Sequence, residues 1–402
     1  MPARFRPGLP SDVAELSRLF TSQREDRGNT YLGKPALLSA YLRYFLPWNV
    51  YRLCRLFCSL PLDLKLGDAI NDLGAGPLTL PIALWISRPD LRKIPLEFRC
   101  LDRTAAVMEA GKKIFTALTA ANGPAEPAGI KSSAEPGTGG YMPGGPGESR
   151  PWVIKTIRGE LQTRGSRARL STEIRGKLAA FTAAVNLYNE IYFSFSRRDS
   201  ERLEEFAEAQ ARLLTSLTEG SILVAEPGIP QSGEFISLLR SALMAEGGLP
   251  LSPCIHSAAC PLPGGGREKW CHFNFDTEDA PAALHKLSAQ ARIPKERAVL
   301  SYIFTAGAGA GTKPSAARRP DALPAAARII SDAFPLDGAG MHNSWGRYGC
   351  SKDGLVLVSG SRREMELMPS GAGEEISLSG QRDKKSGALL AASNKHLMVQ
   401  EG

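Results

Sequence analysis

Hydrophobic positions recur at helical spacing in the first part of the chain. Val13, Leu16 and Leu19 are three residues apart, which places them on one face of an amphipathic helix. A longer apolar stripe follows and is interrupted at Pro47, so two further helices are expected on either side of this proline. The pattern therefore predicts an N-terminal helical region over residues 1–64.

After this region the pattern changes to short apolar runs that alternate with amphipathic segments. Alternating strands and helices predict a mainly parallel sheet with helices on both of its faces. The predicted fold class is therefore α/β, of the doubly wound kind. The predicted strands are 68–72, 96–102, 152–157, 179–185, 221–226 and 298–305.

Differences in composition along the chain predict where its structural units begin and end. Two stretches rich in small residues and proline, 122–150 and 306–327, lack the apolar content needed to pack and are predicted to be flexible insertions. The predicted units are the helical region (1–64), an α/β domain (65–250), a cysteine segment (251–280), the remainder of the sheet (281–360) and a polar tail (361–402).

The overall composition is that of a folded protein. The chain has 402 residues, is 43% hydrophobic and 22% charged, and carries a formal net charge of +8. This length and composition exclude a wholly disordered chain. The apolar stretch between residues 35 and 64 contains three arginines, so no membrane-spanning helix is expected. The basic charge is compatible with a polyanionic partner but does not by itself identify one.

Cysteine count and the N-terminal sequence bear on location. Seven cysteines are an odd number in a long chain, which favours reduced thiols or metal ligands over a full set of disulfides. The first twenty residues lack the apolar block of a secretory signal. We therefore expect a bacterial protein of the cytoplasm, or a mitochondrial one if the source is eukaryotic.

Two glycines and a carboxylate follow the first predicted strand, as Asp72, Gly74 and Gly76. Glycines there let a ligand approach the backbone, and the next helix points its positive end at the same space. The dinucleotide motif G-x-G-x-x-G does not fit, since Thr79 occupies its sixth position. The pattern resembles motif I of the class I S-adenosylmethionine-dependent methyltransferases. That resemblance implies that these three residues and Asp102, at the end of the second strand, bind S-adenosylmethionine; a tight turn without a ligand is the alternative.

No catalytic group can be assigned from sequence. The segment after the fourth predicted strand lacks the Asn/Asp-Pro-Pro-aromatic motif of enzymes that methylate exocyclic amines, and the Pro-Cys nucleophile of pyrimidine C5 methyltransferases. Asn186, Asn189 and Glu190 stand there instead, and such residues either polarise a substrate or cap the following helix. The catalytic residues therefore stay unknown, and enzymatic activity stays open.

Three cysteines lie close together in the chain, Cys254, Cys260 and Cys271, and Cys350 follows far downstream. This density is typical of a thiolate-ligated centre whose fourth ligand comes from a distant strand. The spacing is unlike the paired C-x-x-C knuckles of zinc ribbons, which leaves an iron–sulfur cluster and zinc both open. Buried thiols without a metal are the alternative. Two histidines of the segment are further candidate ligands, His256 and His272.

The order of these motifs resembles the methyltransferase-like small-ribosomal-subunit protein family, which comprises a mitochondrial small-subunit assembly factor and its bacterial relatives. The resemblance covers about residues 30–360. It implies a class I methyltransferase fold, a [4Fe-4S] cluster on the four cysteines named above, and association with the small ribosomal subunit and its rRNA. The segments that carry it are 39–47, 72–77, 226–228, 254–273 and 295–302.

A basic segment supports an RNA partner. Residues 151–177 carry seven Lys and Arg against two Glu, and arginines among Gly and Ser can follow phosphates without reading sequence. A solvated helix face is the alternative. The leading hypothesis is a small-subunit-associated protein that binds rRNA and acts in assembly or translation. The alternatives are an active rRNA methyltransferase and a small-molecule methyltransferase.

Overall fold

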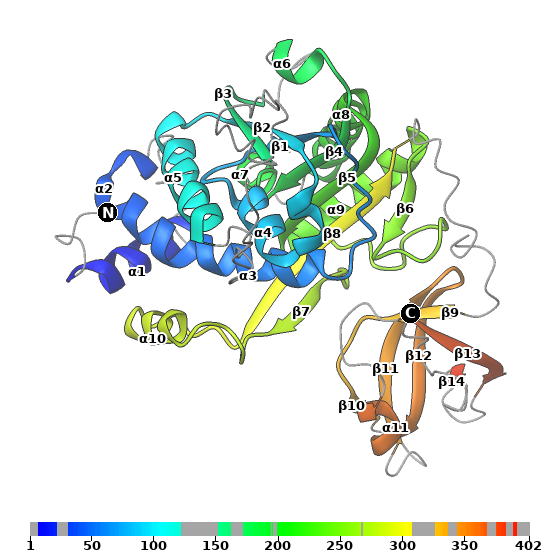
Figure 1. Ribbon diagram of the computed structural model, residues 1–402. Coiled ribbons are helices and arrows are strands. Elements are labelled where there is room, and N and C mark those ends of the chain that lie inside the picture. Colours follow the sequence, from blue (N-terminus) through cyan, green and yellow to red (C-terminus); the bar gives the residue numbers. More distant parts are fainter. Residues whose placement is uncertain are drawn as a thin grey trace, which may run out of the picture.

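The computed structural model describes two sheets and the helices around them (Figure 1). The larger sheet has eight strands and the smaller one has six. In the described part of the chain, no helix is both long and apolar enough to cross a membrane. The residues described are 7–21, 31–121, 152–161, 172–193, 195, 199–266, 268–307, 326–336, 344–367, 375–382 and 389–391.

The N-terminal region is helical, as predicted, but its long helix is not broken at Pro47. A π turn instead joins the two parts, because the Leu46 N–H donates to the carbonyl of Tyr41, five residues back. Pro47 has no N–H and its ring would collide with the carbonyl four residues earlier, and the wider turn avoids this collision. The elements are α1 (Leu9–Phe20), the 3₁₀ turn η2 (Tyr31–Gly33), α2 (Pro35–Ala40), the π turn η3 (Tyr41–Phe45) and α3 (Leu46–Phe57).

The main sheet has the order β3-β2-β1-β4-β5-β8-β6, and β7 pairs with β8. Strands β1 to β5 are parallel, whereas β8 is antiparallel to β5. Every predicted strand overlaps an observed one. The sequence pattern missed β6 and β7, which have four residues each and carry no clear alternation. The bounds are β1 (Ala69–Leu73), β2 (Leu96–Asp102), β3 (Trp152–Arg158), β4 (Ala179–Val185), β5 (Thr218–Pro227), β6 (Leu249–Ser252), β7 (Phe273–Asp276) and β8 (Arg297–Ala306).

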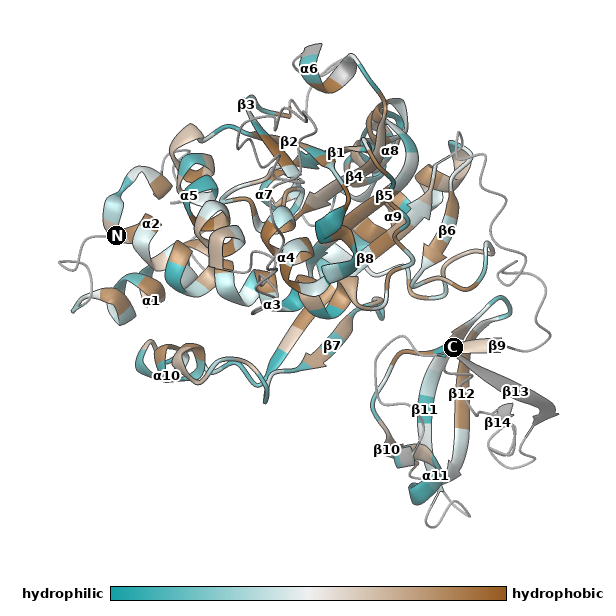
Figure 2. Ribbon diagram, viewed as in Figure 1, coloured by the Kyte–Doolittle hydropathy of each residue, from teal (hydrophilic) through white to brown (hydrophobic). Residues whose placement is uncertain are grey.

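Helices cover both faces of this sheet. On β1, Ile70 belongs to the core shared with α3, α4 and α5, whereas Leu73 belongs to the core shared with α8 and α9. Figure 2 shows that the central strands are largely hydrophobic. A doubly wound α/β architecture is therefore confirmed. The helices are α4 (Thr79–Ser87), the 3₁₀ turn η4 (Pro89–Lys93), α5 (Ala105–Ala121), α6 (Thr172–Arg175), α7 (Asn189–Tyr192), α8 (Ser200–Leu217), α9 (Pro230–Ala245) and α10 (Ala282–Gln290).

The second sheet has the order β10-β11-β12-β14-β13-β9, and β9 also pairs with β11, so that the sheet closes on itself. A small core that includes Ile329, Val358 and Met365 fills it. Its elements are β9 (Ala326–Ile329), β10 (Phe334–Pro335), β11 (Ser344–Ser351), β12 (Gly354–Ser361), α11 (Arg362–Leu367), β13 (Glu375–Arg382) and β14 (Leu389–Ala391).

This sheet changes two of the expected boundaries. Cys350 lies on β11 of the second sheet, not in the remainder of the main sheet, and α11, β13 and β14 fall where a loose polar tail was expected. Strands β11, β12 and β13 have eight residues each, but they contain several Gly and Ser residues, so that alternation is weak and they were missed. The predicted insertion 122–150 lies outside the described residues, as does most of 306–327.

Candidate functional site

The glycine turn after β1 and the end of β2 are joined by hydrogen bonds. The Gly76 N–H donates to Oδ2 of Asp102 at 2.9 Å, and the Thr104 N–H donates to its Oδ1 at 2.8 Å. Gly74 and Gly76 have φ of +73° and +52°, a backbone region that favours glycine. A Cβ on Gly74 would also lie 2.7 Å from Cδ1 of Leu187. The structure therefore brings Gly74, Gly76 and Asp102 together at one edge of the sheet.

Asp72 lies beneath this turn. Its side chain is 2% exposed, and its Oδ2 has no hydrogen-bond partner among the described residues. Burial, and then the nearby charge of Asp102, raise the pKa of Asp72 to about 8. Asp72 does not line the cavity described next, whereas Gly74, Gly76 and Asp102 do. Asp72 is therefore buried outside the lining of this cavity.

A cavity of about 1040 Å³ opens at the carboxyl ends of β1, β2, β4 and β5. The glycine turn and the loops after β2, β3 and β4 form part of its lining. The sequence analysis did not identify the contribution of the N-terminal helices, although their half-buried aromatic and polar residues recur every four positions. The lining residues from this region include Phe20, Tyr41, Phe45, Asn49 and Arg52.

The loop after β4 is held by a buried carboxylate. Glu226, at the end of β5, accepts hydrogen bonds from the N–H of Tyr188 at 2.8 Å and of Asn189 at 3.1 Å, and from Nδ2 of Asn189 at 2.7 Å. Burial raises the pKa of Glu226 to about 7, and these hydrogen bonds oppose the rise. Asn186 precedes the loop with φ of +53° and lines the cavity with Asn189 and Glu190. Asn is among the non-glycine residues that adopt this conformation most readily.

The four predicted cysteine ligands line one small second cavity, of about 30 Å³. Cys254 and Cys260 follow β6, Cys271 precedes β7, and Cys350 comes from β11 of the second sheet. The four cysteines line the same cavity, but this does not by itself make them ligands of one ion. Within the described ranges, no three His, Cys, Asp or Glu side chains are close enough together to form a metal site. The predicted convergence of the four thiols is therefore present, and their ligation of a metal stays a prediction.

Two arginines also line this cavity, Arg240 and Arg328. Arg240 is 3% exposed; its Nε donates to Sγ of Cys254 at 3.2 Å, and its Nη2 donates to the carbonyls of His256 at 2.7 Å and Ala258 at 2.9 Å. A fixed positive charge therefore lies against the first thiol. Such a charge favours the thiolate form, which is the form that binds metals.

Burial acts on the thiols in the opposite direction. It raises the pKa of Cys271 well above its usual value, and it raises the pKa of Cys350 to about 12. The charges of neighbouring thiolates add to both shifts, whereas Arg240 and Arg328 oppose the shift of Cys350. A bound cation would reverse this balance, because it stabilises every thiolate at once.

Only part of the basic segment can be placed. Arg158 lines the large cavity, and Lys155 forms an ion pair with Glu97 at 2.8 Å. The predicted phosphate-binding residues Arg164, Arg167 and Arg169 lie outside the described residues. A basic RNA-binding surface stays a prediction.

These features define the class of protein. A mainly parallel sheet with helices on both faces, and a ligand-sized cavity where a glycine turn meets a strand-end carboxylate, fit the class I methyltransferase fold. Residues 181–334 match the family model described as mitochondrial small ribosomal subunit Rsm22. The predicted resemblance to a small-ribosomal-subunit family is thereby confirmed over this part of the chain, which contains Cys254, Cys260 and Cys271.

The chain is also similar to solved methyltransferase structures. A putative sarcosine dimethylglycine methyltransferase from Galdieria sulphuraria is 12% identical, with 68% of this chain and 88% of that chain covered and a TM-score of 0.28. Fibrillarin from Aeropyrum pernix with bound S-adenosyl-L-methionine is 13% identical, with 64% and 76% covered and a TM-score of 0.28. A putative methyltransferase in complex with the Haloferax volcanii Trm112 activator is 11% identical, with 69% and 96% covered and a TM-score of 0.30. No curated protein matches the sequence.

Proposed function

We propose that the chain is a ribosomal small-subunit-associated protein of methyltransferase fold that binds rRNA and acts in subunit assembly or translation. It holds S-adenosylmethionine in the large cavity and a [4Fe-4S] cluster at the four cysteines. The family match over residues 181–334 supports the ribosomal assignment. One observation carries the proposal: thiols from three separate segments, one of them in the second sheet, meet at a single cavity.

The residues at this cavity fit a [4Fe-4S] cluster. Four thiolates are the usual ligand set of such a cluster, and four cysteines line the cavity. Buried thiolates without a metal would repel one another, and Arg240 and Arg328 offset part of the negative charge that they bring. Zinc is the alternative occupant, because it also accepts four thiolates.

The residues of the large cavity fit S-adenosylmethionine, which supplies a transferable methyl group when it is bound. Gly74 and Gly76 leave room for a ligand against the backbone. Asp102 accepts one backbone N–H on each oxygen, and a carboxylate has about four acceptor positions, so two stay available for ribose hydroxyls.

The cluster is tested on the purified full-length chain by iron and sulfide content together with the absorption spectrum. We expect a brown protein with about four irons per chain that absorbs at about 400 nm. A colourless protein with stoichiometric zinc would overturn the iron assignment.

The ribosomal role is tested by cosedimentation with small subunits at two salt concentrations. Binding that depends on phosphate contacts weakens steeply as salt rises, so we expect much less association at high salt. Association that salt leaves unchanged would contradict binding through phosphate contacts, and no association at either salt concentration would favour a small-molecule methyltransferase. Calorimetry with S-adenosylmethionine tests the cofactor independently.

An active rRNA methyltransferase is the second candidate. Asn186, Asn189 and Glu190 in the cavity lining favour it, because polar groups at this edge can orient an acceptor atom. Transfer of labelled methyl groups to small subunits, lost in Asp102→Ala, supports this activity. Cofactor binding without transfer would leave the assembly role.

A further inference from the structure

The N-terminal wall of the large cavity carries three aromatic rings. The rings of Tyr41 and Phe45 are 6.0 Å apart with an interplanar angle of 22°, and Phe20 meets Phe45 edge-on at 5.0 Å. All three side chains are half-buried and line the cavity. We call this set the aromatic wall. Its rings offer a planar apolar surface to a ligand inside the cavity.

The π turn carries two of these rings. Tyr41 and Phe45 are its first and last residues, and side chains four positions apart lie on the same face of a helix. Such turns are rare and occur frequently at functional sites. Tyr44, in the middle of the turn, points the other way, because its hydroxyl contacts Ser288 Oγ at 3.1 Å and donates to the Ile293 carbonyl at 3.2 Å.

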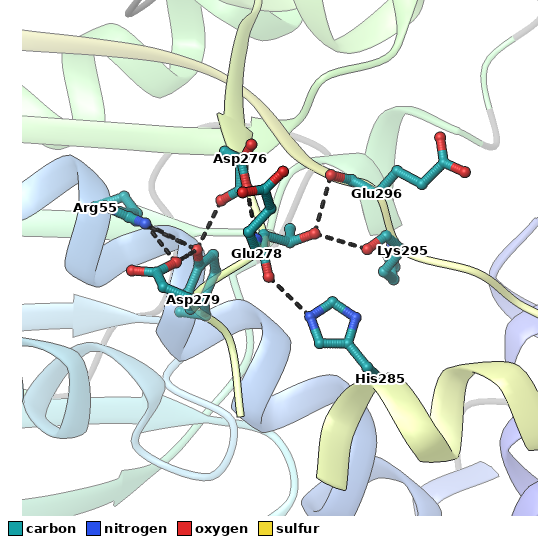
Figure 3. A network of polar contacts seen from close by, with 9 residues as sticks. Arg55, Asp276, Glu278, Asp279, His285, Lys295 and Glu296 are labelled. Atoms are coloured by element: carbon teal, nitrogen blue, oxygen red, sulfur yellow. Dashed lines mark hydrogen bonds and ion pairs between the residues drawn. The ribbon is translucent and has the colours of Figure 1, made fainter. Parts of the chain in front are cut away.

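The helix behind the wall is fixed to the rest of the domain. Tyr51 of α3 donates to the carbonyl of Asp276 at 2.6 Å, and Arg55 forms an ion pair with Asp279. Figure 3 shows Arg55 reaching Asp279, with His285 and Lys295 nearby. Thr277 joins these two residues, because its hydroxyl donates to the Lys295 carbonyl at 2.7 Å and its own carbonyl lies 2.8 Å from Nε2 of His285. Because α3 is held on this side, the wall is set in place before any ligand binds.

A positive charge lies on the same wall. Arg52 lines the cavity; its Nη1 donates to the Val299 carbonyl at 2.9 Å and its Nη2 donates to Asn49. Among the described residues, no carboxylate lies within ion-pair distance of Arg52. Burial lowers the pKa of Arg52 to about 10, so it stays charged at neutral pH, and burial together with Arg52 lowers the pKa of Lys295 to about 8. Arg52 is therefore the group of this wall that attracts an anionic ligand group, whereas Glu190 and Asp102 act on Tyr41 with the opposite charge.

We propose that the aromatic wall is a subsite for one unpaired nucleotide of single-stranded RNA, whose base stacks on Tyr41 and Phe45 and whose phosphate is bound by Arg52. The inference rests on the proposed function and names the substrate class of the same cavity. Proteins select single-stranded RNA by stacking unpaired bases on aromatic rings next to basic groups. The cavity volume of about 1040 Å³ lies at the upper end of the range that is common for ligand pockets, about 300 to 1,000 Å³.

The test uses the full-length chain and a short single-stranded RNA that contains 2-aminopurine. Stacking quenches the fluorescence of this base, so we expect quenching with the wild type and with Tyr41→Phe, which keeps the ring. We expect Tyr41→Leu to bind about tenfold more weakly and without quenching. Arg52→Gln should lower the slope of log affinity against log salt by about one.

Phe334→Leu is the matched control, because this half-buried ring of β10 lines neither cavity. Unchanged affinity and quenching in Tyr41→Leu would overturn the subsite. Equal affinity for a mononucleotide, or for a duplex of the same sequence, would overturn the assignment to single-stranded RNA.

The failure of the subsite and the failure of the proposed function give different results. If the wild type binds S-adenosylhomocysteine and cosediments with small subunits while Tyr41→Leu keeps its RNA affinity, only the subsite is wrong. If the wild type does neither, the proposed function is wrong. The same calorimetry on Tyr41→Leu checks that the glycine turn still folds.

Discussion

Nε2 of His256 lies 3.2 Å from Sγ of Cys350, although the two residues are 94 positions apart in the chain. His256 belongs to the segment that carries Cys254 and Cys260, and Cys350 belongs to the second sheet. This contact brings the second sheet against the main domain at the cysteine cavity. A metal bound there would therefore join the two sheets as well as its own ligands.

Replacing Cys350 with Ser tests this joining role. We expect Cys350→Ser to lose most of its iron and its absorption at about 400 nm, and to unfold at a lower urea concentration. The matched control is Cys58→Ser, an exposed cysteine directly after α3 that lines neither cavity. A Cys350→Ser protein with full iron content and wild-type stability would contradict the four-cysteine assignment.

Replacing Arg240 with Met should destabilise the cysteine segment. The substitution removes donors from Cys254 Sγ and from the carbonyls of His256 and Ala258, and it leaves buried acceptors unpaired. We expect the free energy of unfolding, measured by urea titration, to fall by about 3 kcal/mol. The exposed Arg212→Met should change it by less than about 0.5 kcal/mol. An equal effect of both substitutions would contradict the bridging role of Arg240.

Replacing Asp102 with Asn should weaken S-adenosylmethionine binding. Asp102 accepts from two backbone N–H groups, and an amide has only one acceptor oxygen, so one of these hydrogen bonds is lost and the glycine turn shifts. We expect calorimetry to show at least about a tenfold higher Kd. Asp353→Asn, in the exposed turn before β12, should bind as the wild type does. Equal affinities of the two variants would place the cofactor elsewhere.

The buried carboxyl of Asp72 should make stability depend on pH. Its folded-state pKa, about 8, is above its unfolded value, so the native state holds a proton that the unfolded chain releases. Stability therefore falls as pH rises from about 5 to 8, by up to about 1.4 kcal/mol per pH unit for this one group. Glu226, with a pKa of about 7, acts in the same direction.

The measurement is the free energy of unfolding of Asp72→Asn and of the wild type across this pH range. The amide cannot titrate, so the variant should show a clearly smaller slope, and the two proteins should differ most at pH 8. A slope that the substitution leaves unchanged would show that Asp72 does not hold the proton.

The sequence predicted local features well. The ends of β2 and β4 agree with the predicted strands residue by residue. Apolar and charged residues alternate at the start of β2, and β4 is apolar except for Thr182. The π turn was not predicted, because Pro47 normally marks a break in a helix. The antiparallel direction of β8 was not predicted either, because strand direction depends on pairing with β5 and not on the composition of β8.

The candidate site also combines features that the sequence predicted with features that only the packing decided. Gly74, Gly76 and Asp102 were identified from a short motif, and they do meet at one edge of the sheet. Asp72 belongs to the same motif but lies under the turn, because strand residues alternate between directions and burial follows from the layers above and below. The sequence analysis did not predict that Tyr41 and Arg52 line the cavity, because that depends on where a separate helix docks.

Sequence by itself determined the strand and helix alternation, the glycine turn and the cluster of Cys254, Cys260 and Cys271, because each depends on residues that are close together in the chain. Only the tertiary structure decided that Cys350 reaches Cys254, Cys260 and Cys271 from a second sheet, and that the N-terminal helices line the large cavity. These features result from the packing of distant segments, in which burial and hydrogen bonding across the whole fold select one arrangement among many that the local pattern allows.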